Sequence, residues 1–294
     1  MSDYQQRLQQ SIDYMEARLG EEVSLADCAQ AAGYSPYYYS RLFHLTTGVM
    51  VADYLRKRRL SQAAIALVQS SRSITNICFD YGFNSPENFT RAFQREHAVT
   101  PSAYRRTRSS LCLLQPRNIA AQSPEQAQVA PKPRFVVKPA FLLVGYSIRT
   151  SKRGNRQQQT APQLWNRYHA ERLADTIPHG KPAEQRYDIG MLIDFGLEDS
   201  SFTYMVGVEM PVGTRVKPPL TAQEIPMMEY AVFATPPADK HTFVNTIHRT
   251  WGAIYQQWLP NAGVEHAGTH EFETYCEASE SYSEDIYIPI IRRQ

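Results

Sequence analysis

The chain is short of cysteine and of long hydrophobic runs, and each absence excludes a class of protein. Its 294 residues include four cysteines, with no close pair and no metal-ligand spacing among them: Cys28, Cys78, Cys112 and Cys276. This usage does not fit a disulfide-stabilised secreted domain. No apolar run approaches the roughly 18 residues of a membrane span. The polar start MSDYQQR lacks the hydrophobic region of a secretory signal. We therefore expect a cytoplasmic, reduced protein without membrane contact.

Signatures of catalysis and of cofactor binding are also missing. The chain has no phosphate-binding glycine loop and no nucleophile elbow. His266 and His270 stand four residues apart, a metal-ligand spacing on a helix, but Gly268 between them and an expected strand after them argue against a helix there. We expect no enzyme, no cofactor, no metal site and no catalytic residue.

The net charge of the chain is small, but its basic residues are locally concentrated. The formal net charge is +2, and basic residues gather at positions 56–59 (RKRR) and 105–108 (RRTR). A charge run is usually a solvated face. These two basic runs lie next to the sequence repeat described below, and there contact with nucleic acid phosphates is the better interpretation. We expect Arg56 and Arg58 to make such contacts.

The strongest positive signal is a repeat. Residues 24–36 (SLADCAQAAGYSP) are answered by residues 73–86 (SITNICFDYGFNSP). In each copy a serine caps a short helix, a glycine (Gly33 or Gly82) ends it in a left-handed turn, and Ser-Pro begins a second helix. One copy would also fit an ordinary structural hairpin. Two copies predict a duplicated helix-turn-helix, the geometry that places a second helix in a DNA major groove.

The two copies carry arginines in register, Arg41 and Arg91, and a long helix from Val51 connects them. Its roughly 18 residues span about 27 Å, close to the roughly 34 Å between successive major grooves. One chain could therefore place both helices in adjacent grooves, and we expect a monomer on DNA. Apolar residues at helical spacing are expected in the core: Cys28, Leu42, Phe43, Cys78, Ala92 and Phe93.

The pattern Gly82-Phe-x-Ser-Pro-x-x-Phe89-x-Arg91-x-Phe93, followed by Thr100-Pro101-x-x-Tyr104-Arg105, resembles the signature of AraC/XylS-family transcription regulators. The resemblance covers residues 6–108. It departs from the family at Ala98, where glycine is usual, and we expect a small local adjustment there. It implies a DNA-binding regulator, most simply a bacterial, nucleoid-associated activator whose partners are double-stranded promoter DNA and RNA polymerase.

The resemblance also implies which side chains contact DNA: Tyr37, Tyr38, Ser40 and Arg41 on the first recognition helix, and Glu87, Asn88, Thr90 and Arg91 on the second. The chemistry supports this assignment, since arginine bonds guanine bidentately, asparagine suits adenine and glutamate accepts from the cytosine amino group.

Residues 1–110 are thus expected to form an all-α DNA-binding domain, residues 111–132 a flexible linker, and residues 133–294 a separate α+β domain. The linker is rich in Pro, Gln, Ala and Ser. The second domain shows strand-helix-strand-strand twice, which predicts helices on one antiparallel sheet. The expected elements are 135–148, 162–176, 187–195, 202–210, 230–235, 242–259, 270–277 and 285–291.

This second part resembles the GyrI-like effector-binding domain at Tyr230-Ala-Val-Phe, Trp258-Leu-Pro, Phe272-Glu-x-Tyr275 and Ile286-Tyr-Ile-Pro289. The resemblance implies an aromatic cleft with a carboxylate that holds a small lipophilic, cationic ligand. Strand alternation puts Glu273 and Tyr275 on one face, and a cation could compensate the buried charge. Further candidates for the cleft are Tyr146, Trp165, Tyr187 and Tyr204, with Glu209 and Glu284 as alternative carboxylates.

Three interpretations of the second domain stay open. Glu273 could bind an effector cation, or it could lie in solvent or hydrogen-bond a tyrosine for structural reasons. As some GyrI-like domains are similar to small-molecule hydrolases, Glu273 could also be a general base. Finally, the domain could be a protein-interaction module without a ligand. We expect the effector-binding role.

Overall fold

The structure is a computed structural model, which describes residues 3–119, 132–150, 157–178, 186–193, 202–239, 242–275 and 283–292. The chain divides into two compact units, residues 1–125 and residues 126–294. Each is described by itself. No helix in the described ranges is long and apolar enough to cross a membrane.

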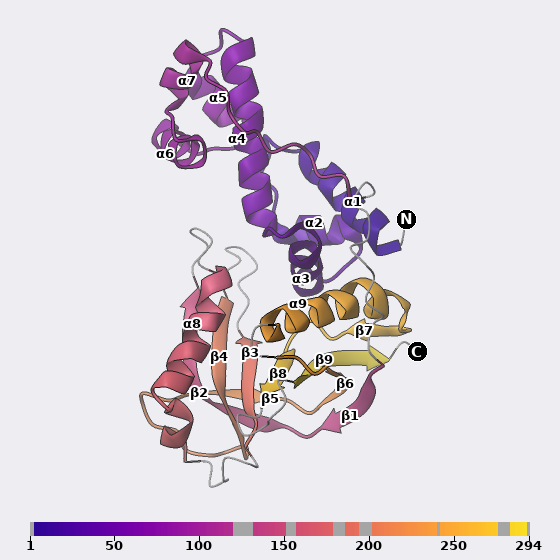
Figure 1. The fold of residues 1–294 in the computed structure, drawn as a ribbon. Coiled ribbons are helices and arrows are strands. Elements are labelled where there is room, and N and C mark those ends of the chain that lie inside the picture. Colours follow the sequence, from indigo (N-terminus) through magenta and orange to yellow (C-terminus); the bar gives the residue numbers. More distant parts are fainter. Residues whose placement is uncertain are drawn as a thin grey trace. The chain divides into compact units, whose positions relative to one another are not determined.

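The first unit is all α-helical. Its helices are α1 (Asp3–Glu16), α2 (Leu25–Ala32), α3 (Pro36–Thr47), α4 (Val51–Gln69), α5 (Ile74–Asp80), α6 (Pro86–His97) and α7 (Pro101–Thr107). In Figure 1, α4 runs between one group of helices, α1 to α3, and another, α5 to α7. The predicted double helix-turn-helix is therefore present, with α3 and α6 as the second helices of the two copies.

Capping side chains place these helices where the repeat predicts them. The hydroxyls of Ser24, Ser35, Ser73 and Ser85 each accept a hydrogen bond from a backbone N–H in the first turn of the helix that follows. Gly33 and Gly82 have φ values of 68° and 72°, the left-handed conformation that ends a helix.

Each half of the first unit has its own core. Tyr39, Phe43 and Tyr54 pack ring against ring beneath α1. In the other half, Phe89 and Phe93 pack with α4 and Tyr104. The residues predicted for the core are all buried: Cys28, Leu42, Phe43, Cys78, Ala92 and Phe93.

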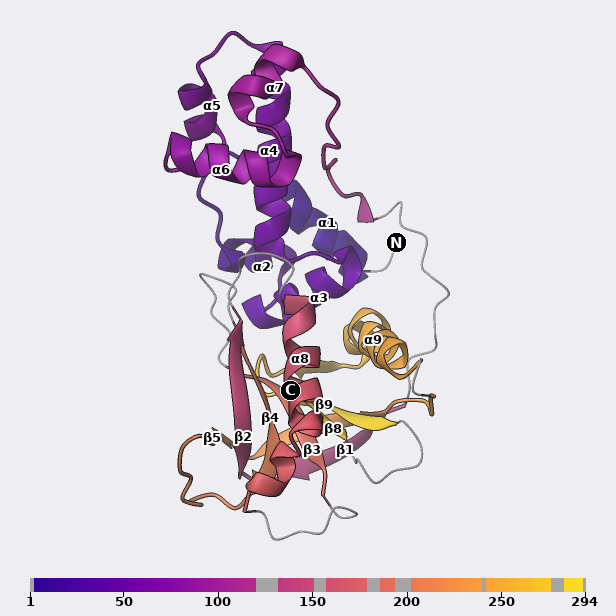
Figure 2. The same cartoon turned by 60° about the vertical axis from the view of Figure 1, so that its left-hand side comes forward.

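Residues 111–119 differ from the expected flexible linker. They have no regular secondary structure, but they run from α7 beside α4 to α1 (Figures 1 and 2) and hydrogen-bond to side chains of both helices. Ile119 is fully buried. The linker prediction was therefore wrong for these residues, because the side-chain partners that hold them lie about fifty to one hundred positions away in the sequence. Residues 120–131 lie outside the described residues.

The second unit is an antiparallel sheet with helices against it. Its strands are β1 (Arg134–Lys138), β2 (Phe141–Thr150), β3 (Asp188–Ile193), β4 (Phe202–Met210), β5 (Thr221–Ile225), β6 (Met228–Ala234), β7 (Val264–His266), β8 (Phe272–Tyr275) and β9 (Glu284–Arg292). Their order is β1-β6-β9-β8-β3-β4-β2-β5, and β7 pairs with β9. The predicted α+β class is confirmed.

Several element bounds differ from the prediction. The strand expected over 135–148 is two strands, β1 and β2. The helix expected over 162–176 is α8 (Gln157–Ala170), with Pro162 inside it, followed by a 3-10 turn at Leu173–Thr176. The second helix is α9 (Phe243–Ala253), which continues as a π-helical turn at Ile254–Trp258. The strands β5 and β7 were not predicted.

Strand alternation separates the two faces of this sheet. One face carries Tyr204, Val206 and Val208 against α8. The other carries Met205, Ile189 and Phe272 in a second core cluster. Figure 2 shows α8 and α9 as two separate helices in front of the strands. Trp165 of α8 and Trp251 of α9 both reach the cluster of Tyr204 and Glu273, so the two helices lie against the same face of the sheet.

Candidate functional site

The exposed face of α6 carries most of the predicted second set of DNA contacts. Glu87, Asn88 and Arg91 are exposed, and Thr90 is half-buried. The Arg91 guanidinium donates to Asn88 Oδ1 at 2.5 Å, so the two side chains lie together. Donors from the Glu87 backbone and the Ser85 hydroxyl lower the pKa of Glu87, which keeps it a charged acceptor. The buried side of α6 carries Phe89, Ala92 and Phe93, which hold the helix in place.

The predicted contacts on α3 are less exposed. Tyr37, Tyr38 and Ser40 are buried, and Arg41 is half-buried. The Tyr38 ring lies 4.8 Å from the ring of Tyr34. The role of these four residues in DNA binding stays a prediction.

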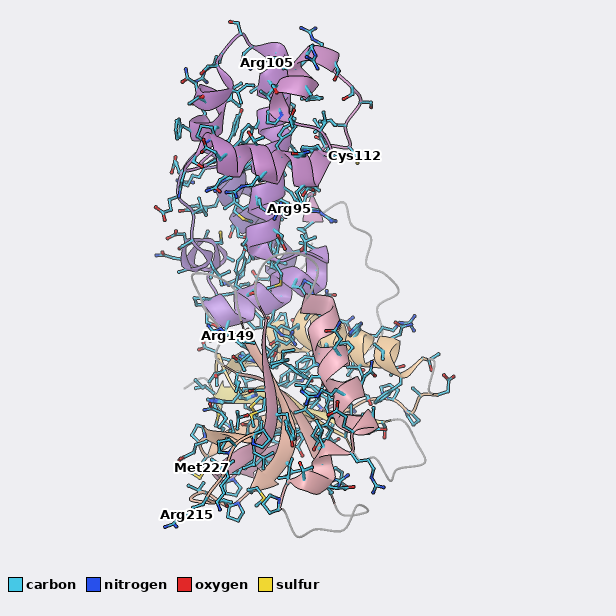
Figure 3. The ribbon with its side chains drawn as sticks, turned by 90° about the vertical axis from the view of Figure 1, so that its left-hand side faces the viewer. Arg95, Arg105, Cys112, Arg149, Arg215 and Met227 are labelled. Carbon is cyan, nitrogen blue, oxygen red and sulfur yellow. The ribbon has the colours of Figure 1, made fainter. Side chains whose placement is uncertain are left out.

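The basic clusters divide into paired and exposed arginines. Arg56 contacts Asp53 at 3.1 Å and Glu96 at 3.3 Å. The guanidinium of Arg105 donates to the Leu67 carbonyl, whereas Arg106 and Arg108 are exposed. The exposed Arg95 on α6 was not among the predicted contacts (Figure 3).

Arg58 is a correction. Only 1% of its surface is exposed, and its guanidinium binds Glu16 with two hydrogen bonds of 2.8 and 2.7 Å. A third bond goes to the Leu114 carbonyl. Because its donors are used inside the first unit, Arg58 cannot contact a phosphate as we expected; it is a buried ion-pair residue.

In the second unit, Glu273 lies at the centre of a cluster contributed by four elements. Its Oε1 accepts from the Tyr204 hydroxyl at 3.0 Å, and its Oε2 accepts from Trp251 Nε1 at 3.4 Å. Trp165 Nε1 in turn donates to the Tyr204 hydroxyl at 2.9 Å. Burial, and secondly the negative Glu273, raise the pKa of Tyr204 well above its usual value, so its hydroxyl stays protonated as a donor.

Gly190 on β3 makes room for this cluster. Its Cα faces the same side as Glu273, its register partner on β8. A Cβ at this position would collide with the Tyr204 hydroxyl and would lie 3.0 Å from Trp165 Cζ2 and 3.2 Å from Glu273 Oε1. Because those contacts are closer than normal packing allows, only glycine fits there without displacing the cluster.

Aromatic rings surround the carboxylate. Tyr275 lies two residues from Glu273 on the same face, as alternation predicted. Its ring centroid is 6.2 Å from that of Trp165, 5.7 Å from that of His169 and 6.0 Å from that of Phe243. The rings of Trp165 and His169 are stacked. Aromatic side chains from α8 and from α9 therefore both contact Tyr275 beside the carboxylate.

The remaining candidates divide by strand face. Tyr187 precedes β3 and is 58% exposed, so nothing in the structure places it with Glu273, and its role stays a prediction. Glu209 faces away from the cleft and binds Lys138 at 2.6 Å. Tyr146 lies on the α8 side but hydrogen-bonds to Thr176. Glu284 is on the cleft face, directly opposite Tyr275.

Glu284 is a second carboxylate beside the cluster. It is 7% exposed, and its Oε1 is buried without a hydrogen-bond partner in the described part of the chain. Burial raises its pKa well above the usual value, and the charges of Glu273 and Asp285 raise it further. It is therefore protonated at a pH at which an exposed glutamate is ionised.

Sequence reasoning missed Trp251 and Gly190. The indole N–H of Trp251 donates to the Glu273 carboxylate. The periodicity places it correctly on the inner face, but cannot tell a packing indole from a hydrogen-bonding one. Nothing in the local sequence marks Gly190, because its role depends on side chains from α8, β4 and β8.

Each of the two units matches a known protein family. A helix-turn-helix domain family matches residues 28–107. The family of integron-associated effector binding proteins matches residues 134–290, more than half of the chain. The chain belongs to this family. Its helix-turn-helix part is of the AraC type, so both resemblances seen in the sequence are confirmed.

Relatives of this family member in the DNA-binding part include three bacterial proteins. The transposon Tn10 TetD protein of Escherichia coli is 42% identical over 95 residues, which are 32% of this chain and 69% of TetD. Regulatory protein SoxS of Salmonella typhimurium is 35% identical over 102 residues, 35% of this chain and 95% of SoxS. The right origin-binding protein of Escherichia coli K12 is 42% identical over 94 residues, 32% of each chain, so the match spans about a third of that relative.

Proposed function

We propose that the protein is a transcription activator that reads an asymmetric promoter site with α3 and α6 and responds to a small lipophilic cation bound at Glu273. It acts as a monomer on DNA and contacts RNA polymerase there. The observation that carries the sensing role is the position of Glu273, a carboxylate between two helices and among aromatic rings.

The DNA-binding role is supported by the outward side chains of α6. Arg91, Asn88 and Glu87 offer a bidentate donor, an amide and an acceptor, which together can discriminate between base edges in the major groove. Arg95, Arg106 and Arg108 add exposed positive charge on α6 and next to it, suited to phosphate contacts.

The cation is supported by the chemistry of the cleft. The hydrogen bonds that Glu273 accepts from Tyr204 and Trp251 orient its carboxylate. Ring faces attract cations, with energies of about 0.5–2 kcal/mol each. A lipophilic cation would bind the carboxylate and bury its apolar surface against Trp165 and Tyr275.

The test is a titration of the full-length protein with tetraphenylphosphonium, followed by tryptophan fluorescence, since Trp165 and Trp251 flank the carboxylate. Tetraphenylborate, of the same shape and opposite charge, is the matched ligand control. Glu273→Gln should weaken phosphonium binding at least about tenfold. Glu224→Gln, an exposed glutamate on β5, should leave it unchanged.

Equal binding of the cation and the anion, or undiminished phosphonium binding by Glu273→Gln, would contradict the proposal. Turnover of an electrophilic compound that is lost in Glu273→Gln would instead make Glu273 a general base.

A further inference from the structure

Residues 111–119, hereafter the clasp, contact both halves of the DNA-binding unit. Leu111 and Leu113 pack against the core that α4 shares with α5 to α7. Further along, the backbone N–H of Leu114 donates to Ser61 Oγ at 3.0 Å. The clasp thus begins on the half that contains α6 and continues along α4.

The other end of the clasp is held by α1. The Gln9 side chain uses both of its amide atoms: Nε2 donates to the Arg117 carbonyl at 3.4 Å, and Oε1 accepts from the Ile119 N–H at 2.9 Å. The Arg117 N–H donates to the Tyr54 hydroxyl at 3.2 Å. Helix α1 belongs to the half that contains α3, so one short segment ties the two halves together.

A buried ion pair lies beneath the clasp. Glu16 on α1 receives two hydrogen bonds from Arg58 and one from the Tyr54 hydroxyl. The third bond of Arg58 goes to the clasp carbonyl of Leu114. A buried charge pair is stable only when its remaining donors and acceptors are satisfied, so the clasp, α1 and α4 are fixed in one arrangement at the middle of α4.

The distance and twist between α3 and α6 matter for DNA binding because successive major grooves are related by the helical twist of DNA. On the proposed function, α3 and α6 read two successive major grooves, and one inserted base pair turns the second groove by about 34° around the DNA axis. A helix pair joined by α4 alone could bend or twist to follow. A pair tied by a second connection could not follow without breaking buried contacts.

We propose that the clasp fixes the spacing and twist between α3 and α6, and that Gln9, Tyr54, Ser61 and Arg58 are positioning residues that determine which half-site spacing the protein accepts. This proposal rests on the DNA-binding function proposed above. It assigns a recognition role to a segment and to four side chains that touch no base.

The experiment uses full-length protein and a duplex selected by that protein from a random pool. Affinity is measured on the selected site, on the same site with one base pair inserted between its two elements or removed, and on duplexes with one element scrambled. The wild-type protein should lose at least about tenfold in affinity when the spacing changes, comparable with the cost of a mismatched base pair.

Two variants loosen the clasp in different ways. The double variant Gln9→Ala/Ser61→Ala removes the helix side chains that hydrogen-bond to the clasp. The variant Arg117→Pro removes the backbone N–H that donates to the Tyr54 hydroxyl and changes no helix residue. Both should reduce the spacing penalty to less than about a third of its wild-type value, with little change on duplexes that contain a single element. Gln10→Ala/Ser71→Ala, which changes exposed residues of the same types, should retain the full penalty.

Each outcome has a separate meaning. A spacing penalty that is unchanged in both clasp variants, with thermal unfolding confirming that they are folded, would overturn the clasp proposal alone. Failure of the wild-type protein to select any duplex would overturn the proposed DNA-binding function instead.

Discussion

At the scale of single residues, the sequence predicted side chains well where one element decides their direction. Alternation on β8 correctly put Glu273 and Tyr275 on one face, and Asn88 and Arg91, which the AraC/XylS resemblance implied as outward side chains, are exposed on α6. It was wrong for Arg58, because the partner Glu16 lies 42 positions away and no spacing rule connects the two. Contacts between distant elements decide burial, and a single sequence does not contain them.

The exposed position of Arg91 gives a first prediction. Arg91→Ala should weaken binding to the selected duplex by about 1–3 kcal/mol and relax the base preference at one position. Arg106→Ala, which removes an exposed charge on α7, should weaken selected and random duplexes by similar factors. Electrophoretic or fluorescence titrations with both duplexes separate the two effects. Parallel losses for Arg91→Ala would make it a phosphate contact.

Glu284 gives a prediction about pH. Its pKa in the folded protein is raised, chiefly by burial, above the roughly 4.3 of an exposed glutamate. The folded state therefore binds more protons than the unfolded state in this range, and the free energy of unfolding decreases as pH rises from about 4 through the raised pKa. Glu284→Gln should raise the melting temperature at pH 8 and change it much less at pH 4.5.

Glu224→Gln, which removes an exposed glutamate on β5, is the control variant for this pH effect. A stabilisation by Glu284→Gln that is the same at both pH values would show that volume or packing, and not ionisation, is responsible.

At the scale of elements, local signals fixed the helices of the first unit, whereas tertiary context decided several elements of the second. Serine caps and glycine turns mark α2, α3, α5 and α6 directly. The short strands β5 and β7 have no such punctuation and exist because β2 and β9 offer them a free edge. The π-helical turn after α9 likewise has no signal in the local sequence.

The join of α9 to β8 illustrates this dependence on context. Trp251 and Tyr255, four residues apart, donate to Glu273 on β8 and to Glu271, which immediately precedes β8. The spacings match because four helical residues rise about 6 Å and two strand residues about 6.6 Å. His266 Nδ1 accepts from the Gly268 N–H, which leaves its Nε2 to face Glu271. Glu271 thus anchors the helix and is buried, whereas Glu273 is half-buried.

The C-terminal end of α6 gives a prediction at this scale. Ala98 has a φ of 59°, a left-handed conformation, at the position where α3 ends in Gly48 with a φ of 73°. This conformation costs a non-glycine residue about 1–2 kcal/mol, so Ala98→Gly should raise the free energy of unfolding by about 0.5–1 kcal/mol. Ala52→Gly, in the first turn of α4, should lower it by a similar amount. Urea denaturation of the two variants measures both signs.

At the scale of the whole molecule, the composition correctly indicated two units with different architectures. Each has a core of its own, and Tyr204, Trp165 and Trp251, which bond within the Glu273 cluster, belong to residues 126–294. The sequence suggested one linker of uniform character, but its first nine residues are the clasp. Proline and glutamine content indicates whether a segment forms regular secondary structure by itself. It does not indicate whether side chains elsewhere, here Gln9 and Tyr54, hydrogen-bond to that segment.

A cut between the units tests how separate they are. A specific protease site placed within residues 120–131 should, after cleavage, leave phosphonium affinity within about twofold of the uncut protein, since domains with their own cores keep their sites. Fluorescence reports this binding cleanly, because all three tryptophans lie in the second unit. A loss beyond tenfold would mean that the first unit contributes part of the ligand site.

The missing β-carbon of Gly190 has a genetic consequence. A glycine codon becomes an alanine codon by a single base change, and the added methyl group would displace Tyr204, Trp165 or Glu273. Such an allele would keep every residue of α3 and α6 and therefore its DNA sequence preference. On the proposed function, one nucleotide would thus separate an effector-responsive regulator from one whose response is lost, and a screen for loss of that response should recover changes at this codon.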